Sequence, residues 1–97
     1  MGYYPGVKWA VRGPRHLEKI LKRLPGEVGR IFEALVADLE SEGPFPKGWR
    51  IEHLNGHWEG FLKAVLKRDY RAIYRYESNI VTIFIEKVAD RKDAYGR

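Results

Sequence analysis

The stretch from residue 67 to residue 85 constrains the fold most, because it has the pattern of two antiparallel strands joined by a tight turn near residues 77–79. Side chains alternate across a strand, so the even positions from 70 to 76, three tyrosines and an alanine, share one face. The opposite face carries Arg71, Ile73 and Arg75. The second strand begins at Ile80 and has no charge up to Ile85, which is typical of a strand covered on both sides.

Two amphipathic helices are predicted upstream, on either side of Pro25–Gly26, because apolar residues recur there at helical spacing. The two stripes are Leu17, Ile20, Leu21 and Leu24, then Val28, Ile31, Phe32, Leu35 and Leu39. A connection this short makes the helices antiparallel, so together they can cover one face of a sheet.

Further strands are predicted at residues 7–11, 49–54 and 58–66, with a Gly- and Pro-rich loop at 43–48. This order predicts an α+β fold in which an N-terminal strand and a two-helix hairpin pack on one face of a twisted, mainly antiparallel sheet of four or five strands. The length of 97 residues fits one domain, residues 1–97.

Composition narrows the functional classes. Cysteine is absent, which excludes disulfides and thiolate zinc sites, and His16, His53 and His57 match no ligand spacing, so neither a metal nor a cofactor is expected. No apolar run is long enough to span a bilayer and no signal segment is evident, so a cytoplasmic protein is expected. Eighteen Lys and Arg against thirteen Asp and Glu give a net charge of +5, which favours polyanionic partners.

Three segments, 54–56, 69–75 and 88–95, resemble in order and spacing the RelE/ParE superfamily of toxins from type II toxin–antitoxin systems. The strongest part of the resemblance is Tyr-Arg-x-Ile-Tyr at 70–74, followed by a downstream arginine and a tyrosine near the C-terminus. Leu-Pro at 24–25 also resembles the family, so the resemblance covers nearly the whole chain and is strongest to RelE-like mRNA interferases.

This resemblance implies a metal-independent endoribonuclease that cuts mRNA on the ribosome and is neutralised by a cognate antitoxin. It implies a catalytic set of Arg71, Arg91, Tyr95 and Lys63, in which Lys63 is the first of two basic residues on the preceding strand. The second would fall on Ala64 or Val65, neither of which is basic, so Lys67 is the candidate replacement.

These residue types suit RNA cleavage by the adjacent 2′-hydroxyl. Guanidinium groups bind phosphate oxygens bidentately and stay charged. Tyr95 can act as the base if nearby cations lower its pKa, and otherwise it stacks on a base or orients the nucleophile. The cations assigned to RNA binding are Lys67, Arg68, Arg75 and Lys92.

Other interpretations stay open at this point. A ParE-like toxin would bind DNA gyrase without catalysis, and a plain RNA-binding domain would explain the charge alone. Arg71 could pair structurally with Asp69 or Glu86, Lys63 could be a solvated side chain, and Tyr95 could pack against the core.

Overall fold

The computed structural model describes residues 8–67 and 69–94. In this part of the chain the strands form one sheet in the order β1-β5-β4-β3-β2, and neighbouring strands are antiparallel except for the parallel pair β1 and β5. The strands are β1 (Ala10–Arg12), β2 (Ile51–His53), β3 (Leu62–Lys67), β4 (Tyr70–Glu77) and β5 (Thr82–Asp90). The predicted α+β architecture with a mainly antiparallel sheet is therefore confirmed.

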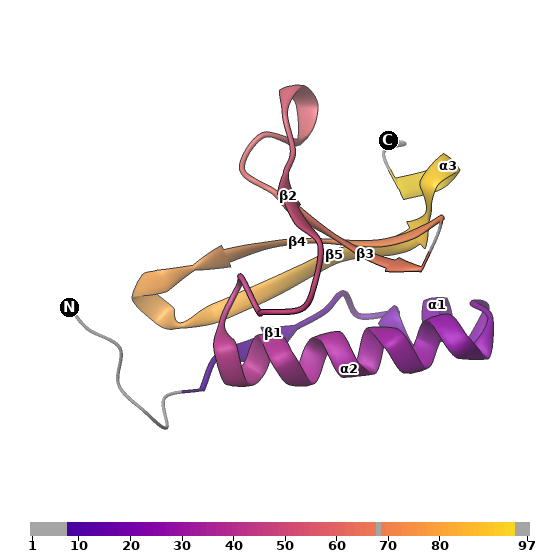
Figure 1. Cartoon of the computed structure of the whole chain (residues 1–97), viewed down its shortest axis with the longest axis horizontal. Coiled ribbons are helices and arrows are strands. Elements are labelled where there is room, and N and C mark those ends of the chain that lie inside the picture. The colour runs from indigo at the N-terminus through magenta and orange to yellow at the C-terminus, as the bar shows by residue number, and fades with distance from the viewer. Residues whose placement is uncertain (1–7, 68, 95–97) are drawn as a thin grey trace.

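Two helices cover one face of the sheet, α1 (Leu17–Lys22) and α2 (Gly26–Glu42), as Figure 1 shows. The longer helix buries the predicted stripe, with Val28, Phe32, Leu35 and Leu39 almost fully buried. The helix begins after Pro25 and ends at Gly43, whose φ of 92° favours glycine. None of the helices in the described residues is long and apolar enough to cross a bilayer.

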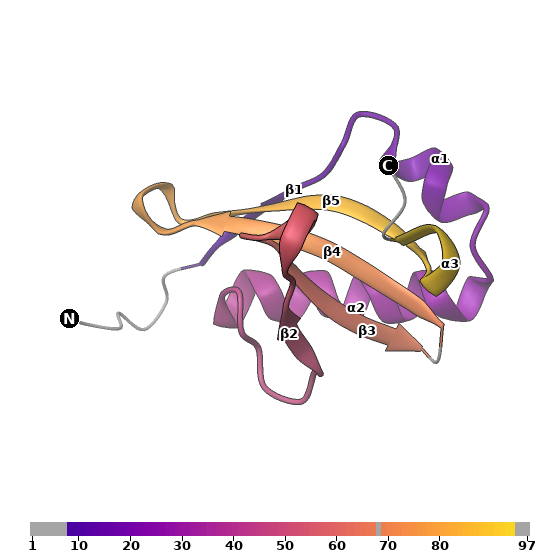
Figure 2. The same ribbon diagram turned by 90° about the horizontal axis from the view of Figure 1, so that it is seen from above.

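The other side of the sheet carries two short elements, the 3₁₀ turn η1 (Gly56–Trp58) and the helix α3 (Arg91–Ala94). Both lie opposite α1 and α2 in Figure 1 and lie over the strands in the second view (Figure 2). We call the sheet face on the side of η1 and α3 the open face. The sheet therefore has a helix-covered face that forms the core and an open face bordered by these two elements.

The predicted β4–β5 hairpin forms, with the turn η2 (Ser78–Ile80) between its strands, so that the second strand begins at Thr82 rather than at Ile80. Its tyrosine-bearing face is the core face, where Ala72 and Tyr74 are completely buried. The Tyr74 hydroxyl donates a 2.6 Å hydrogen bond to the Pro44 carbonyl, which attaches the loop after α2 to the centre of the sheet. Burial raises the pKa of Tyr74, so the hydroxyl keeps its proton and remains a donor.

Several predicted boundaries are wrong. The first strand covers Ala10–Arg12 rather than 7–11, of which residue 7 lies outside the described residues. The strand predicted from residue 58 begins at Leu62, because 56–58 form η1 and Gly60 has a φ of 95° that breaks the extended run. The chain after Val88 is not only a polar tail, since β5 continues to Asp90 and α3 follows.

Candidate functional site

The open face is built from alternate positions of three neighbouring strands. Two rows of residues run across β3, β4 and β5 in the registers of these strands. One row is Lys63, Ile73 and Lys87, and the other is Val65, Arg71 and Ala89. Irregularities in the pairing fall between Val65 and Lys67 and between Ile73 and Tyr74. The described residues of these strands on the open face are Lys63, Val65, Arg71, Ile73, Arg75, Phe84, Lys87 and Ala89.

Arg71 is the most buried cation of this face, with 8% of its surface exposed. Its Nε is buried and has no hydrogen-bond partner within the described residues. None of the ion pairs formed by residues 8–67 and 69–94 includes it, so the structural alternative of a pair with Asp69 or Glu86 is not seen. A buried donor without a hydrogen-bond partner is costly, so this one needs an explanation, and a bound ligand is one.

Two lysines flank Arg71 diagonally, one on each neighbouring strand. Lys63 on β3 and Lys87 on β5 lie on opposite sides of Ile73, the residue two positions along β4 from Arg71. Lys63 Nζ lies 3.1 Å from Glu52 Oε1 on the edge strand β2. Hydrogen bonds from Arg50 and Lys63 lower the pKa of Glu52, so this carboxylate stays ionised beside the cationic face.

Sequence reasoning missed Lys87. Its Nζ donates a 2.8 Å hydrogen bond to the Asp93 carbonyl of α3 and lies 5.8 Å from the centre of the Trp58 ring. The strand was predicted only as far as Ile85, although the alternating pattern continues beyond it. Extending that pattern would have placed Lys87 on the strand beside the one that carries Arg71.

Arg91 and Lys92 begin α3 and are exposed. With Asp69 and Asp90 they line an open cavity of about 480 Å³. Since Arg71 lies opposite Ala89, the register brings Arg91 close to the Arg71 end of the open face. Tyr95 and Arg68, which the sequence placed in the catalytic and RNA-binding sets, lie outside the described residues.

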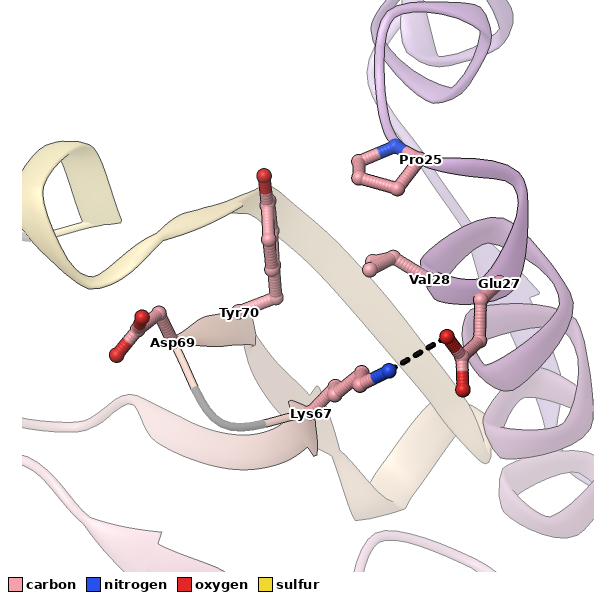
Figure 3. Close-up of a pocket in the computed structure, with 6 residues that line it drawn as sticks. All are labelled: Pro25, Glu27, Val28, Lys67, Asp69 and Tyr70. Atoms are coloured by element: carbon pink, nitrogen blue, oxygen red, sulfur yellow. Dashed lines mark hydrogen bonds and ion pairs between the residues drawn. The ribbon is translucent and has the colours of Figure 1, made fainter.

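Lys67 points away from Arg71. Figure 3 shows its ammonium directed at Glu27 of α2, with which it forms an ion pair beside Val28 and Tyr70. The pairing irregularity after Val65 explains this direction, because it offsets the alternation that would have put Lys67 on the open face. The Lys67 hydrogen bond lowers the pKa of Glu27. The proposed replacement for the second strand cation is therefore not beside Lys63.

The remaining predicted cation, Arg75, lies farther along the open face. Its guanidinium carbon is 4.3 Å from the centre of the Phe84 ring, and its Nη1 is 2.8 Å from Glu77 Oε2. The structure thus brings Lys63, Arg71 and Lys87 together, puts Arg91 at one end, and leaves Arg75 at the other. Within the described ranges, no cluster of three or more His, Asp or Glu side chains is placed to bind a metal ion.

Solved structures of toxins share this architecture. RelE in the archaeal RelE–RelB complex from Pyrococcus horikoshii superposes with a TM-score of 0.72 and 28% identity, over 90% of this chain and 99% of that one. The chain has the RelE/ParE toxin fold. No family model and no curated protein sequence matches it.

Two further structures share the RelE/ParE toxin fold. The toxin–antitoxin complex RelBE2 from Mycobacterium tuberculosis matches with a TM-score of 0.67 and 25% identity, over 91% of this chain and 97% of that one. A metal-bound toxin from Helicobacter pylori matches with a TM-score of 0.69 and 16% identity, over 90% of this chain and 99% of that one. At this identity the likeness shows the fold alone.

Proposed function

We propose that this chain is the toxin of a type II toxin–antitoxin pair and that it cleaves mRNA on the ribosome, in the cytoplasm. The observation that carries this proposal is Arg71, a buried guanidinium whose Nε has no partner in the described residues, on the open face of a RelE/ParE fold. Lys63 and Lys87 add positive charge on either side of it. An RNA phosphate would pair with the exposed part of the Arg71 guanidinium.

The proposed reaction is an attack of the ribose 2′-oxygen on the adjacent phosphorus. The new 2′-O–P bond forms as the P–O5′ bond breaks, which yields a 2′,3′-cyclic phosphate and a 5′-hydroxyl. Arg71 and Arg91 would stabilise the charge that develops on the phosphoryl oxygens. Tyr95 would take the 2′-hydroxyl proton or orient that hydroxyl, and the 5′-oxygen must gain a proton as it leaves. The reaction needs no metal ion or cofactor.

A ParE-like toxin that inhibits DNA gyrase is the second candidate. The lack of a second β3 cation on the open face favours it, because Ala64 is completely buried in the core and Val65 is apolar. Lys67, at the end of the same strand, is paired with Glu27 of α2. Both candidates predict a cognate antitoxin, and an acidic amphipathic segment would complement the open face. A cognate partner should raise the unfolding temperature on mixing.

The test combines primer extension on mRNA from cells that produce the toxin with a gyrase supercoiling assay on purified protein. We expect cut mRNA and unaffected supercoiling. Arg91→Ala should lower cleavage by about a hundredfold or more and leave ribosome binding nearly intact, because its contribution is made in the transition state. Tyr95→Phe should lower cleavage strongly if the hydroxyl takes part in proton transfer. Growth arrest with intact mRNA and inhibited supercoiling would reject the nuclease in favour of the gyrase inhibitor.

A further inference from the structure

The helix α3 is too short to hold its own position. It has four residues, and isolated helices of this length are not stable in water. Ala94 is completely buried, and the Asp93 backbone N–H donates a 2.9 Å hydrogen bond to Asp90 Oδ1. The hydrogen bond to Asp90 is local, whereas the packing of α3 against β4 and β5 joins the short helix to the sheet.

Lys87 adds a hydrogen-bonded attachment from the sheet to this packing. Its ammonium donates to the Asp93 carbonyl at 2.8 Å, so it meets the backbone of α3 from the middle of β5. A charged donor makes a stronger hydrogen bond than a neutral one. The cation also lies near the C-terminal end of the helix, where the backbone dipoles favour positive charge.

The same ammonium contacts the opposite border of the open face. It lies 5.8 Å from the centre of the Trp58 ring, and Trp58 packs edge-to-face against Phe61 at 5.2 Å. Trp58 belongs to η1, which Figures 1 and 2 show on the same side of the sheet as α3. Lys87 therefore connects the two elements that border the open face.

The other lysines on the described strands form ion pairs with elements other than α3. Lys63 pairs with Glu52 of β2, and Lys67 pairs with Glu27 of α2. Lys87 makes its contact with α3, the helix that begins with Arg91. Because Arg91 is part of α3, its position relative to Arg71 depends on how α3 is held. Lys87 attaches this helix to β5, the strand that pairs with the Arg71 strand.

We infer that Lys87 is a positioning residue that holds α3, and with it Arg91, against the open face. The catalytic part of this inference rests on the proposed nuclease function, whereas the structural part does not. A displacement of about 1 Å can lower a rate about a hundredfold, so loosening α3 should affect cleavage more than it affects binding.

The experiment compares Lys87→Met, Lys87→Arg and the control Lys22→Met. Lys22 is an exposed lysine on α1, a helix on the other side of the sheet from α3, so its replacement removes the same charge without removing the hydrogen bond to Asp93. One readout is hydrogen exchange of the Asp93 and Ala94 amides by NMR. The other is the rate of mRNA cleavage at saturating ribosome, measured together with ribosome affinity.

In Lys87→Met we expect these amides to exchange about tenfold faster or more. The cleavage rate should fall by about a hundredfold, with ribosome affinity changed less than about threefold. Arginine keeps the charge and the donors, so Lys87→Arg should restore most of the protection and most of the rate. Lys22→Met should match the wild type in both readouts.

Unchanged amide exchange in Lys87→Met would overturn the inference, whatever happens to cleavage. Faster exchange with a normal cleavage rate would overturn its catalytic part. A lower rate combined with unchanged exchange would instead make Lys87 a direct ligand of the RNA. If the wild-type protein did not cleave mRNA, the proposed function would fail, and the exchange measurement would still decide whether Lys87 holds α3.

Discussion

The Lys63 ammonium lies 3.1 Å from Glu52, and the same carboxylate accepts a 2.9 Å hydrogen bond from Arg50. Glu52 therefore competes with any phosphate that approaches Lys63. Glu52→Gln should raise affinity for single-stranded RNA by about two- to fivefold and make that affinity fall more steeply with salt. Fluorescence anisotropy over a salt series measures both the affinity and its dependence on salt. Glu27→Gln removes a lysine-paired carboxylate on the other side of the sheet, so an equal effect there would show that net charge alone is responsible.

The ion pair between Lys67 and Glu27 predicts a pH dependence of folding. A hydrogen bond from Lys67 lowers the pKa of Glu27 below its ordinary 4.5, so the pair stabilises the fold above that pH. This contribution disappears as the pH falls through the lower, folded-state pKa. Lys67→Met should therefore flatten the decline in unfolding free energy between about pH 5 and pH 3, measured by urea denaturation. An unchanged decline would mean that the pair contributes nothing to acid stability.

Replacing Arg71 is predicted to raise the stability of the fold and to abolish mRNA cleavage. Methionine has a similar length and no charge, so Arg71→Met removes a buried, unpartnered guanidinium nitrogen without leaving a large cavity. Such replacements are often stabilising, here by about 1–2 kcal/mol. Calorimetry should show an unfolding temperature higher by several degrees, and mRNA cleavage should be lost. A less stable variant would show that Arg71 serves the fold.

The Tyr74 hydroxyl is predicted to stabilise the fold rather than to take part in chemistry. Tyr74→Phe removes its 2.6 Å hydrogen bond and leaves the Pro44 carbonyl without that donor. The expected cost is about 1–3 kcal/mol, because a buried polar group loses its partner. The unfolding temperature should fall by several degrees while the cleavage rate of the folded protein stays normal. Equal stability of the two proteins would contradict this role.

Local pattern was sufficient for much of the fold. The Pro25–Gly26 break, the apolar stripe of α2 and the β4–β5 hairpin follow from spacing and turn residues within short windows, and the structure confirms them. The parallel pairing of β1 with β5 joins distant segments, and no short window of sequence contains that information. The segment between Trp58 and Phe61 was misassigned because its aromatic residues suit a strand, whereas Gly60 takes a positive φ.

The sequence also predicted some residues of the candidate site and not others. Motif resemblance and alternation were enough to place Lys63 and Arg71 on one face. They did not predict the direction of Lys67, since a single irregularity after Val65 changes which side a residue faces. Lys87 was missed because the strand was predicted only as far as Ile85, and because its contact with Trp58 joins residues that are far apart in the sequence. The roles of Arg91 and Tyr95 stay predictions.

The pairing of Ala10 with Thr82 also bears on how the protein is made. β1 joins the sheet only beside β5, so β1 has no strand to pair with until β5 has been synthesised and has left the ribosome. The strand order places β5 between β1 and β4. The pairing of β1 with β5 joins strands that are far apart in the sequence, and such pairings slow folding. A nascent chain that still lacks β5 therefore cannot complete the sheet that carries Arg71. Under the proposed function, synthesis itself would delay the moment at which the toxin could act on the ribosome that produced it.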